Sequence, residues 1–390
     1  MKFSTAVLTL GITLTCGAAQ ATVSHVFVSN SGDGTISVIK CVTSKGKKPI
    51  VCKEKDSKDV GFNFSWPANQ YEGHPAWWWT GLSGEVVGVK AKASLSPLKN
   101  PNNTVFVDTY DVPGLRDSGA NFIGISPDGR TAWNSAREVD RIQEIDTDPD
   151  SPTFGTILTE LVVPDLDPVA GEDPAALGLA RPCDATITPD GRFFLEPDLA
   201  GESLTVVDTQ AKAIIHQVQP PEAVPGEKVR PFMATTNGKI VLVENLEGDN
   251  TYDIWDVSGL PAEPEYLAKL TQADDGLGVD AQTSEFTPDG QYAYLIMRGV
   301  SNVDPSDPDA SRLDVLDVVE GSATYLQVVN SIELPFNCRA STGDFSKDGR
   351  FFFVNCNGSD ELVVVDSLSE SVVDSVKLAD GAGPRGVVVR

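Results

Sequence analysis

The chain has 390 residues, with 56 acidic and 30 basic side chains, which gives a formal net charge of −26. This charge argues against a protein that binds nucleic-acid phosphates, because such binding needs a basic footprint, and it disfavours adsorption to anionic lipid. A hydrophobic content of 41% is enough to form a folded core. With only three histidines, a multi-histidine metal centre is disfavoured. The composition alone indicates no reaction.

The first 21 residues have the pattern of a secretory signal peptide. Lys2 precedes an apolar run over 6–16, and Ala19-Gln20-Ala21 fits a cleavage site. We expect cleavage after Ala21 and a mature chain, 22–390, that is periplasmic or secreted and forms a single domain. No later stretch approaches the ~18 apolar residues that cross a bilayer, so we predict no membrane insertion.

Five cysteines follow the predicted cleavage site, and export permits disulfides. Cys41 and Cys52 bracket a short lysine-rich loop and are the first candidate pair. Cys338 and Cys356 flank one predicted hairpin and are the second, although simple register counting does not place them opposite each other. Cys183 is left over, either buried or as a free thiol. The pairing stays open at this stage.

A short motif repeats along the chain. Residues 125–130 (Ile-Ser-Pro-Asp-Gly-Arg) have counterparts at 187–192, 286–291 and 345–350, with a shortened copy at 235–239. Each copy places an Asp-Gly or Asn-Gly turn between alternating or β-branched runs, which predicts a hairpin. Downstream of each copy an apolar strand ends in aspartate, at Asp146, Asp208, Asp256, Asp317 and Asp366. The predicted unit is therefore four short strands, with almost no helical periodicity.

Four short strands repeated about every 50 residues are typical of a β-propeller blade. Residues 25–39 have the pattern of the second and third strands of a blade that lacks its first. Residues 383–390 have the pattern of a first strand with nothing after it. Pairing of the two ends would close the ring without an unpaired edge. We predict an all-β propeller of seven four-stranded blades, with six as the alternative because 55–115 contains only a degenerate unit.

The same two end segments, 25–39 and 383–389, resemble the YVTN repeat, in which a Pro-Arg-Gly-Val strand and an Asp-Gly turn are followed by a strand ending in Ala-Asn-Ser-Gly. The resemblance covers most of 25–40 and 120–390. It implies an architecture rather than a chemistry. Relatives by fold include surface-layer-type proteins, lactonases, cytochrome-linked enzymes and the large subunits of amine dehydrogenases.

Four arginines are the candidate ligand-binding residues at the mouth of the propeller channel. Arg181 and Arg339 each lie ten residues before a turn glycine. Arg230, like Arg181, is followed by a proline. When the units are aligned on this proline, Arg385 lies two positions after the place of Arg181. Arginines that converge there could bind a carboxylate or phosphate through bidentate hydrogen bonds. The competing interpretation is that they pair with aspartates of the neighbouring blades and tie the ring together.

An aromatic-rich segment is the second candidate site. We interpret about 55–82 as an insertion outside the strand pattern. It could form a stacking platform for a sugar ring, a quinone or a partner protein, or a lid packed on the propeller. A single histidine is a weak indication of copper. The residues that define this segment are Trp66, Tyr71, His74, Trp77, Trp78 and Trp79.

Acidic loops at 146–150, 247–250 and 304–309 are the third feature. Oxygen-rich loops can hold calcium, although exposed acidic turns are usually simply solvated. None of the three has the spacing of an EF-hand. We predict no cofactor, with calcium as the one metal that these loops could hold.

The sequence contains no G-x-S-x-G elbow, P-loop, H-E-x-x-H or C-x-x-C-H motif. We therefore predict an exported YVTN-type propeller that acts as a non-catalytic binding module for a protein partner or a small anionic ligand. One alternative is the propeller subunit of a periplasmic oxidoreductase that resembles amine dehydrogenases. The other is a lactonase-type hydrolase, which needs a metal or an acid–base pair at the channel mouth.

Overall fold

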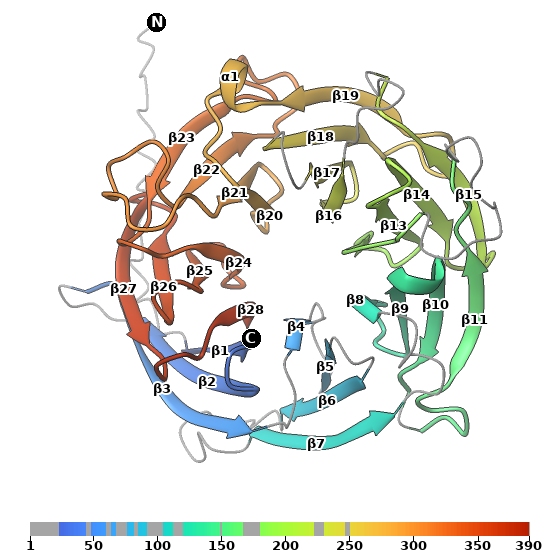
Figure 1. Ribbon diagram of the computed structural model, residues 1–390, viewed down its shortest axis with the longest axis horizontal. Helices are drawn as coiled ribbons and strands as arrows, with labels where there is room; N and C mark the ends of the chain where they lie inside the picture. Colours follow the sequence, from blue (N-terminus) through green and yellow to red (C-terminus); the bar gives the residue numbers. More distant parts are fainter. Residues whose placement is uncertain are drawn as a thin grey trace, which may run out of the picture.

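The described residues of the protein form a ring of seven four-stranded antiparallel sheets around one central axis (Figure 1). The computed structural model describes residues 23–43, 48–59, 64–67, 76–81, 85–91, 104–111, 120–148, 150–166, 180–221, 230–245 and 250–389. The predicted signal peptide lies outside these residues. The all-β propeller with seven blades is confirmed, and the six-blade alternative is wrong.

The strands of each sheet follow one another from the axis outwards (Figure 1). The sheet that joins the chain ends contains β28 (Pro384–Val389), β1 (Val23–Asn30), β2 (Thr35–Thr43) and β3 (Ile50–Asp59). The next two contain β4 (Phe64–Pro67), β5 (Ala76–Gly81), β6 (Glu85–Ala91), β7 (Thr104–Asp111), and β8 (Ala120–Ile125), β9 (Thr131–Ala136), β10 (Arg141–Asp146), β11 (Ile157–Val162).

Four further sheets complete the ring, with a short 3-10 helix η1 (Arg137–Val139) after β9 and a short helix α1 (Gln272–Asp275) after β19. Two of them contain β12 (Thr186–Ile187), β13 (Phe193–Asp198), β14 (Ser203–Asp208), β15 (Ala213–Val218), and β16 (Pro231–Thr236), β17 (Ile240–Asn245), β18 (Thr251–Asp256), β19 (Glu265–Leu270). The last two contain β20 (Ala281–Phe286), β21 (Tyr292–Met297), β22 (Arg312–Asp317), β23 (Val328–Glu333), and β24 (Ala340–Phe345), β25 (Phe351–Cys356), β26 (Glu361–Asp366), β27 (Ser371–Lys377).

The two chain ends close the ring as the sequence predicts. Strand β28 pairs antiparallel with β1, and Phe27 lies opposite Val388. The N–H group of Gly32 continues the contact by donating to the carbonyl of Ala382 at 2.8 Å. The C-terminal segment therefore supplies the innermost strand of the sheet that begins the chain, and no inner edge of that sheet is left unpaired.

The repeated Asp-Gly turns have one common construction, illustrated by the copy before β13. Oδ1 of Asp190 accepts hydrogen bonds from the Thr188 hydroxyl at 2.6 Å and from the N–H group of Arg192 at 3.1 Å. Gly191 takes a φ of +72°, a region that glycine enters without steric cost. The motif therefore fixes the tight link between the first and second strands of a sheet.

The hydrophobic core lies between neighbouring sheets, because each sheet packs against the preceding blade with one face and against the following blade with the other. One cluster joins sheet β20–β23 to sheet β24–β27 and includes Tyr294, Leu313, Phe345 and Phe352, all at most 6% exposed. The innermost strands carry polar side chains instead, such as Thr283 in β20. The apolar faces hold the blades together and leave the axis to polar groups.

Both predicted disulfides are present. Cys41 of β2 is bonded to Cys52 of β3, its register partner. Cys338, which precedes β24, is bonded to Cys356 at the end of β25. Cys183 is fully buried and takes part in neither disulfide.

The prediction of an insertion at 55–82 is wrong where the structure describes that segment. Strand β3 continues to Asp59, and β4 and β5 are the two inner strands of a sheet. Trp66 therefore lies in β4, and Trp77, Trp78 and Trp79 lie in β5. Tyr71 and His74 lie outside the described residues. The tryptophan run has no period-two alternation, which is why the strand was missed.

The ring has two faces that differ in the links they carry. Neighbouring strands of each sheet run antiparallel, so successive connections alternate between the two faces. One face carries the segments that lead into each innermost strand and those that join the second strand of a sheet to the third. We call this the mouth face. The Asp-Gly turns lie on the opposite face, which we call the turn face. No helix among the described residues is long and apolar enough to cross a membrane.

Candidate functional site at the mouth face

Equivalent residues of several blades lie at the entry to the innermost strands. Arg230, Asp280 and Arg339 directly precede β16, β20 and β24. Arg181 precedes Pro182, which bridges to the end of β13. Arg181, Asp280 and Arg339 have left-handed φ values of 54°, 59° and 50°, which are unfavourable for residues with a Cβ atom. The sequence therefore identified a real structural position but missed that Asp280 holds it in one blade.

Each left-handed residue is held by a side chain of the preceding blade. In every case its backbone N–H group donates to a side-chain oxygen at 2.8 or 2.9 Å, and this bond offsets part of the conformational cost. The pairs are Arg181 with Asp140, Asp280 with Asn250, and Arg339 with Ser311.

Two arginines lie beside Asp280, and a third lies within electrostatic range of one of them. Oδ2 of Asp280 lies 3.6 Å from Nη2 of Arg339 and 4.0 Å from Nε of Arg298. Nη1 of Arg339 also donates to the Ser301 hydroxyl at 2.8 Å. Arg385, exposed near the start of β28, lies within electrostatic range of Arg298. We call Arg298, Arg339 and Arg385 the arginine cluster.

The charges of this cluster are not balanced by Asp280 alone. Burial lowers the pKa of Arg298, and the positive charges of Arg339 and Arg385 lower it further, whereas Asp280 opposes the shift. A lowered pKa means that the surroundings disfavour the charged guanidinium. An added anion would therefore stabilise the cluster.

A buried carboxyl group lies within electrostatic range of the cluster. Glu244, near the end of β17, is 1% exposed, and neither of its carboxyl oxygens has a hydrogen-bond partner among the described residues. Burial raises its pKa well above the ordinary value, and the charges of Asp184 and Asp280 raise it further, while Arg298 opposes them. These surroundings favour the neutral, protonated form of Glu244, which could donate a proton.

A second buried carboxyl group belongs to a different pair of blades. Glu196 of β13 accepts a hydrogen bond from the Ser135 hydroxyl at 2.6 Å. Burial raises its pKa well above the ordinary value, and the Ser135 bond opposes the shift. Since Ser135 is in β9, this contact joins two neighbouring sheets, and we assign it to the interior rather than to the candidate site.

The structure brings together two of the four predicted arginines. Arg339 and Arg385 belong to the arginine cluster, and Arg339 also forms the ion pair to a neighbouring blade that the competing interpretation expected. Arg181 and Arg230 lie at the corresponding entries of other blades. The sequence analysis did not identify Arg298, because this residue follows β21 and lies outside the repeated turn motif from which the other arginines were located.

The described residues contain no group of three or more His, Cys, Asp or Glu side chains that could hold a metal ion. In the acidic loop 304–309, Oδ1 of Asp304 accepts bonds from the N–H group and the hydroxyl of Ser306. This carboxylate therefore holds its own turn. Calcium binding by the acidic loops stays a prediction.

Comparison with solved structures supports the propeller fold. The chain resembles the periplasmic gluconolactonase of Pseudomonas aeruginosa, with a TM-score of 0.66 and 17% identity over 94% of this chain and 99% of that chain. It also resembles a proposed 6-phosphogluconolactonase of Bacteroides fragilis, with a TM-score of 0.66 and 13% identity over 94% and 98% of the two chains.

A functionally unknown protein of Desulfotomaculum acetoxidans is similar to the same extent, with a TM-score of 0.63 and 16% identity over 94% and 98% of the two chains. No family model and no curated protein matches the sequence. At these identities the likenesses establish the fold alone. The chain is a β-propeller.

Proposed function

We propose that the mouth face binds a small anionic ligand through a carboxylate or phosphate group. The observation that carries the proposal is the excess of positive charge in the arginine cluster, where Arg298 and Arg339 share the single carboxylate of Asp280 and Arg385 adds a third positive charge within electrostatic range of Arg298. Guanidinium groups match planar oxyanions with paired hydrogen bonds. The cluster is positive although the whole chain is strongly acidic.

Titration calorimetry with inorganic phosphate and with gluconate tests this function. The double variant Arg298→Ala/Arg339→Ala should abolish binding, while Arg130→Ala should leave it unchanged. Arg130 is a fit control because its side chain is 70% exposed and lies in an Asp-Gly turn of the turn face. Equal binding by the double variant and the wild type would refute the proposal, provided both melt at similar temperatures.

Lactone hydrolysis is the second candidate, and Glu244 is the observation that favours it. A protonated carboxyl group beside cationic side chains is a combination that can serve lactone opening. Arginines would stabilise the charge on the carbonyl oxygen, and an acid would protonate the departing ring oxygen. Two of the similar structures carry lactonase names.

In this reaction water adds to the carbonyl carbon, the ring C–O bond breaks, and the products are a carboxylic acid and a hydroxyl group. Asp280, with a side chain 39% exposed, could take the proton that the water loses. Acid release from glucono-δ-lactone tests the activity. Glu244→Gln should lower kcat while leaving KM near its wild-type value, and an unchanged rate would exclude this role.

Export to the periplasm or medium is part of the same proposal. The two disulfides support it, because such bonds persist in oxidising compartments. Membership of the YVTN-repeat group, and the alternative of a subunit of an amine-dehydrogenase-like oxidoreductase, stay predictions.

A further inference from the structure

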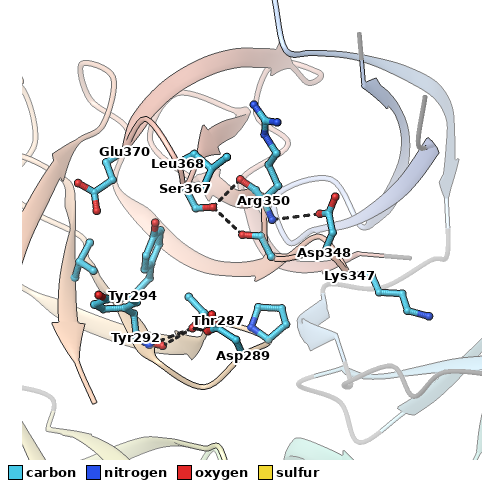
Figure 2. Close-up of a pocket in the computed structure, with 13 residues that line it drawn as sticks. Thr287, Asp289, Tyr292, Tyr294, Lys347, Asp348, Arg350, Ser367, Leu368 and Glu370 are labelled. Atoms are coloured by element: carbon cyan, nitrogen blue, oxygen red, sulfur yellow. Dashed lines mark hydrogen bonds between the residues drawn. The ribbon is translucent and has the colours of Figure 1, made fainter. Parts of the chain in front are cut away.

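A groove of about 710 Å³ opens on the turn face between sheet β20–β23 and sheet β24–β27 (Figure 2). Tyr294 and Val315, each 2% exposed, lie at its floor. Tyr292 and Leu368, 38% and 77% exposed, lie at its rim. The volume is in the range of small-molecule sites. The groove lies on the opposite face from the arginine cluster.

The floor of the groove offers an unused hydrogen-bond donor. The ring of Tyr294 is held by edge contacts with Phe345 and Phe352, at centroid distances of 5.0 and 5.1 Å. Within the described part of the chain its hydroxyl has no hydrogen-bond partner. Burial raises the pKa of Tyr294, and the charges of Glu370 and Asp366 raise it further, so the hydroxyl stays protonated.

The lining combines aromatic surface with charges of both signs. Figure 2 shows Glu370 on the side of the tyrosines, while the charged ends of Lys347 and Arg350 point away from them. Arg350 is moreover paired with Asp366 at 3.0 Å. An anionic ligand would meet the like charge of Glu370 beside the tyrosines, whereas the hydroxyl groups of a neutral ligand can both donate and accept hydrogen bonds.

The corresponding groove between sheets β12–β15 and β16–β19 shows that the repeat alone does not create this site. Its volume is only about 280 Å³. Phe193, 5% exposed, stands where the larger groove has Tyr292, and the fully buried Leu195 replaces Tyr294. Leu260, four residues after Asp256, packs on the core there, whereas Glu370 stands four residues after Asp366 in the larger groove. The larger groove therefore depends on residues in which these two pairs of blades differ.

We propose that the groove lined by Tyr292, Tyr294 and Glu370 binds a neutral saccharide. The exposed ring of Tyr292 would stack on the apolar face of a sugar ring, which buries area and leaves the sugar hydroxyls at the edges. The hydroxyl of Tyr294 would donate to one sugar oxygen, and the carboxylate of Glu370 would accept from another. The propeller then has separate sites for an anion and for a neutral carbohydrate.

The test uses the whole protein and saturation-transfer NMR with maltose, cellobiose and lactose, followed by calorimetry of any sugar that binds. At least one disaccharide should bind. Tyr292→Ala should weaken it about tenfold, the loss expected for one stacking contact of about 1.4 kcal/mol. Tyr292→Phe retains the ring and should change affinity less than twofold, and Glu370→Gln should weaken binding measurably.

Lys239→Ala is the matched control, because Lys239 is an exposed residue of the smaller groove. It should bind sugar like the wild type, as should Arg298→Ala/Arg339→Ala on the mouth face. Failure of all three disaccharides, or unchanged binding by a folded Tyr292→Ala variant, would overturn the proposal. Binding of tetramethylammonium or phosphate that Tyr292→Ala abolishes, in place of sugar, would overturn the ligand class. Neither of these outcomes would count against the proposed anion site on the mouth face.

Discussion

Arg339 and Asp280 occupy the same position in successive blades, immediately before the innermost strand, and their side chains meet at 3.6 Å between Nη2 and Oδ2. The two φ values, 50° and 59°, are also alike. One repeated backbone turn therefore presents a cation in one blade and a carboxylate in the next. This carboxylate would compete with an incoming anion for the arginines.

Replacement of this carboxylate should tighten anion binding. Asp280→Asn removes the negative charge that partly satisfies Arg298 and Arg339. We expect phosphate affinity to rise about two- to fivefold, in line with the strength of a partly exposed ion pair. Calorimetry at low ionic strength measures the change, with Asp309→Asn in the loop of the same face as the control. A weaker affinity for phosphate would show that Asp280 positions the arginines rather than competing for them.

Strand β28 should be essential for stability. Val387 and Val388 are 5% and 3% exposed, and the strand closes the sheet against β1. Removal of residues 384–390 should cost about 3–6 kcal/mol from these two side chains alone, apart from the lost backbone pairing. Urea unfolding of the truncated chain measures the loss. Val388→Asp in the full chain should also be strongly destabilising, and a wild-type midpoint for both would argue against ring closure.

Stability should fall between acid and neutral pH because of Asp344. Burial raises its pKa to about 7, against opposing bonds from the N–H groups of Val389 and Phe345. The folded state thus binds this proton more tightly than the unfolded state, whose pKa is near 3.9. The stabilisation is complete below about pH 4 and is lost as the pH rises to about 7.

Asp344→Asn should therefore flatten the pH dependence in this window and raise the melting temperature at pH 8. An amide oxygen in the same place can still accept the Val389 bond of 2.7 Å. Melting curves at pH 5 and pH 8 give the comparison. Asp208→Asn is a contrasting variant, because bonds from the Ala211 N–H group and from Arg192 lower the pKa of that carboxyl. An identical slope in wild type and Asp344→Asn would contradict the assignment.

The disulfide next to Arg339 should matter for binding as well as for folding. Cys338 and Cys356, both fully buried, connect the segment before β24 to the end of β25. The double alanine variant should lose about 3 kcal/mol of unfolding free energy, the value for a loop of this length. It should also weaken phosphate binding, because Arg339 follows Cys338 directly.

The alanine pair at Cys41 and Cys52 is the matched control for this effect. That bond joins β2 to β3, the two outer strands of another sheet. Its loss should lower the melting temperature without a change in phosphate affinity. If both double variants bind phosphate equally well, the Cys338–Cys356 bond is not needed to position Arg339.

The sequence by itself determined six of the seven blades, because the information for them is local. An Asp-Gly turn such as Asp190-Gly191 specifies a hairpin within six residues, and an apolar strand such as 204–207 must be covered on both faces. The strand patterns at the two chain ends, around Val28 and Val387, also predicted that the ring closes by pairing of these ends. The cysteine positions made both disulfides candidates, and the structure settled the pairing.

Only the tertiary structure decided the sites, because each combines residues from different blades. Arg339, at the entry of β24, reaches Asp280, at the entry of β20 in the neighbouring blade, and this contact depends on how the two sheets pack. The wide groove lies between two sheets, and the ring of Tyr294 at its floor packs against Phe345 and Phe352 of the next blade. Residues close in the sequence determine the turns and strands. Which charged groups meet between two blades, and how wide the groove between them is, depends on how the blades pack.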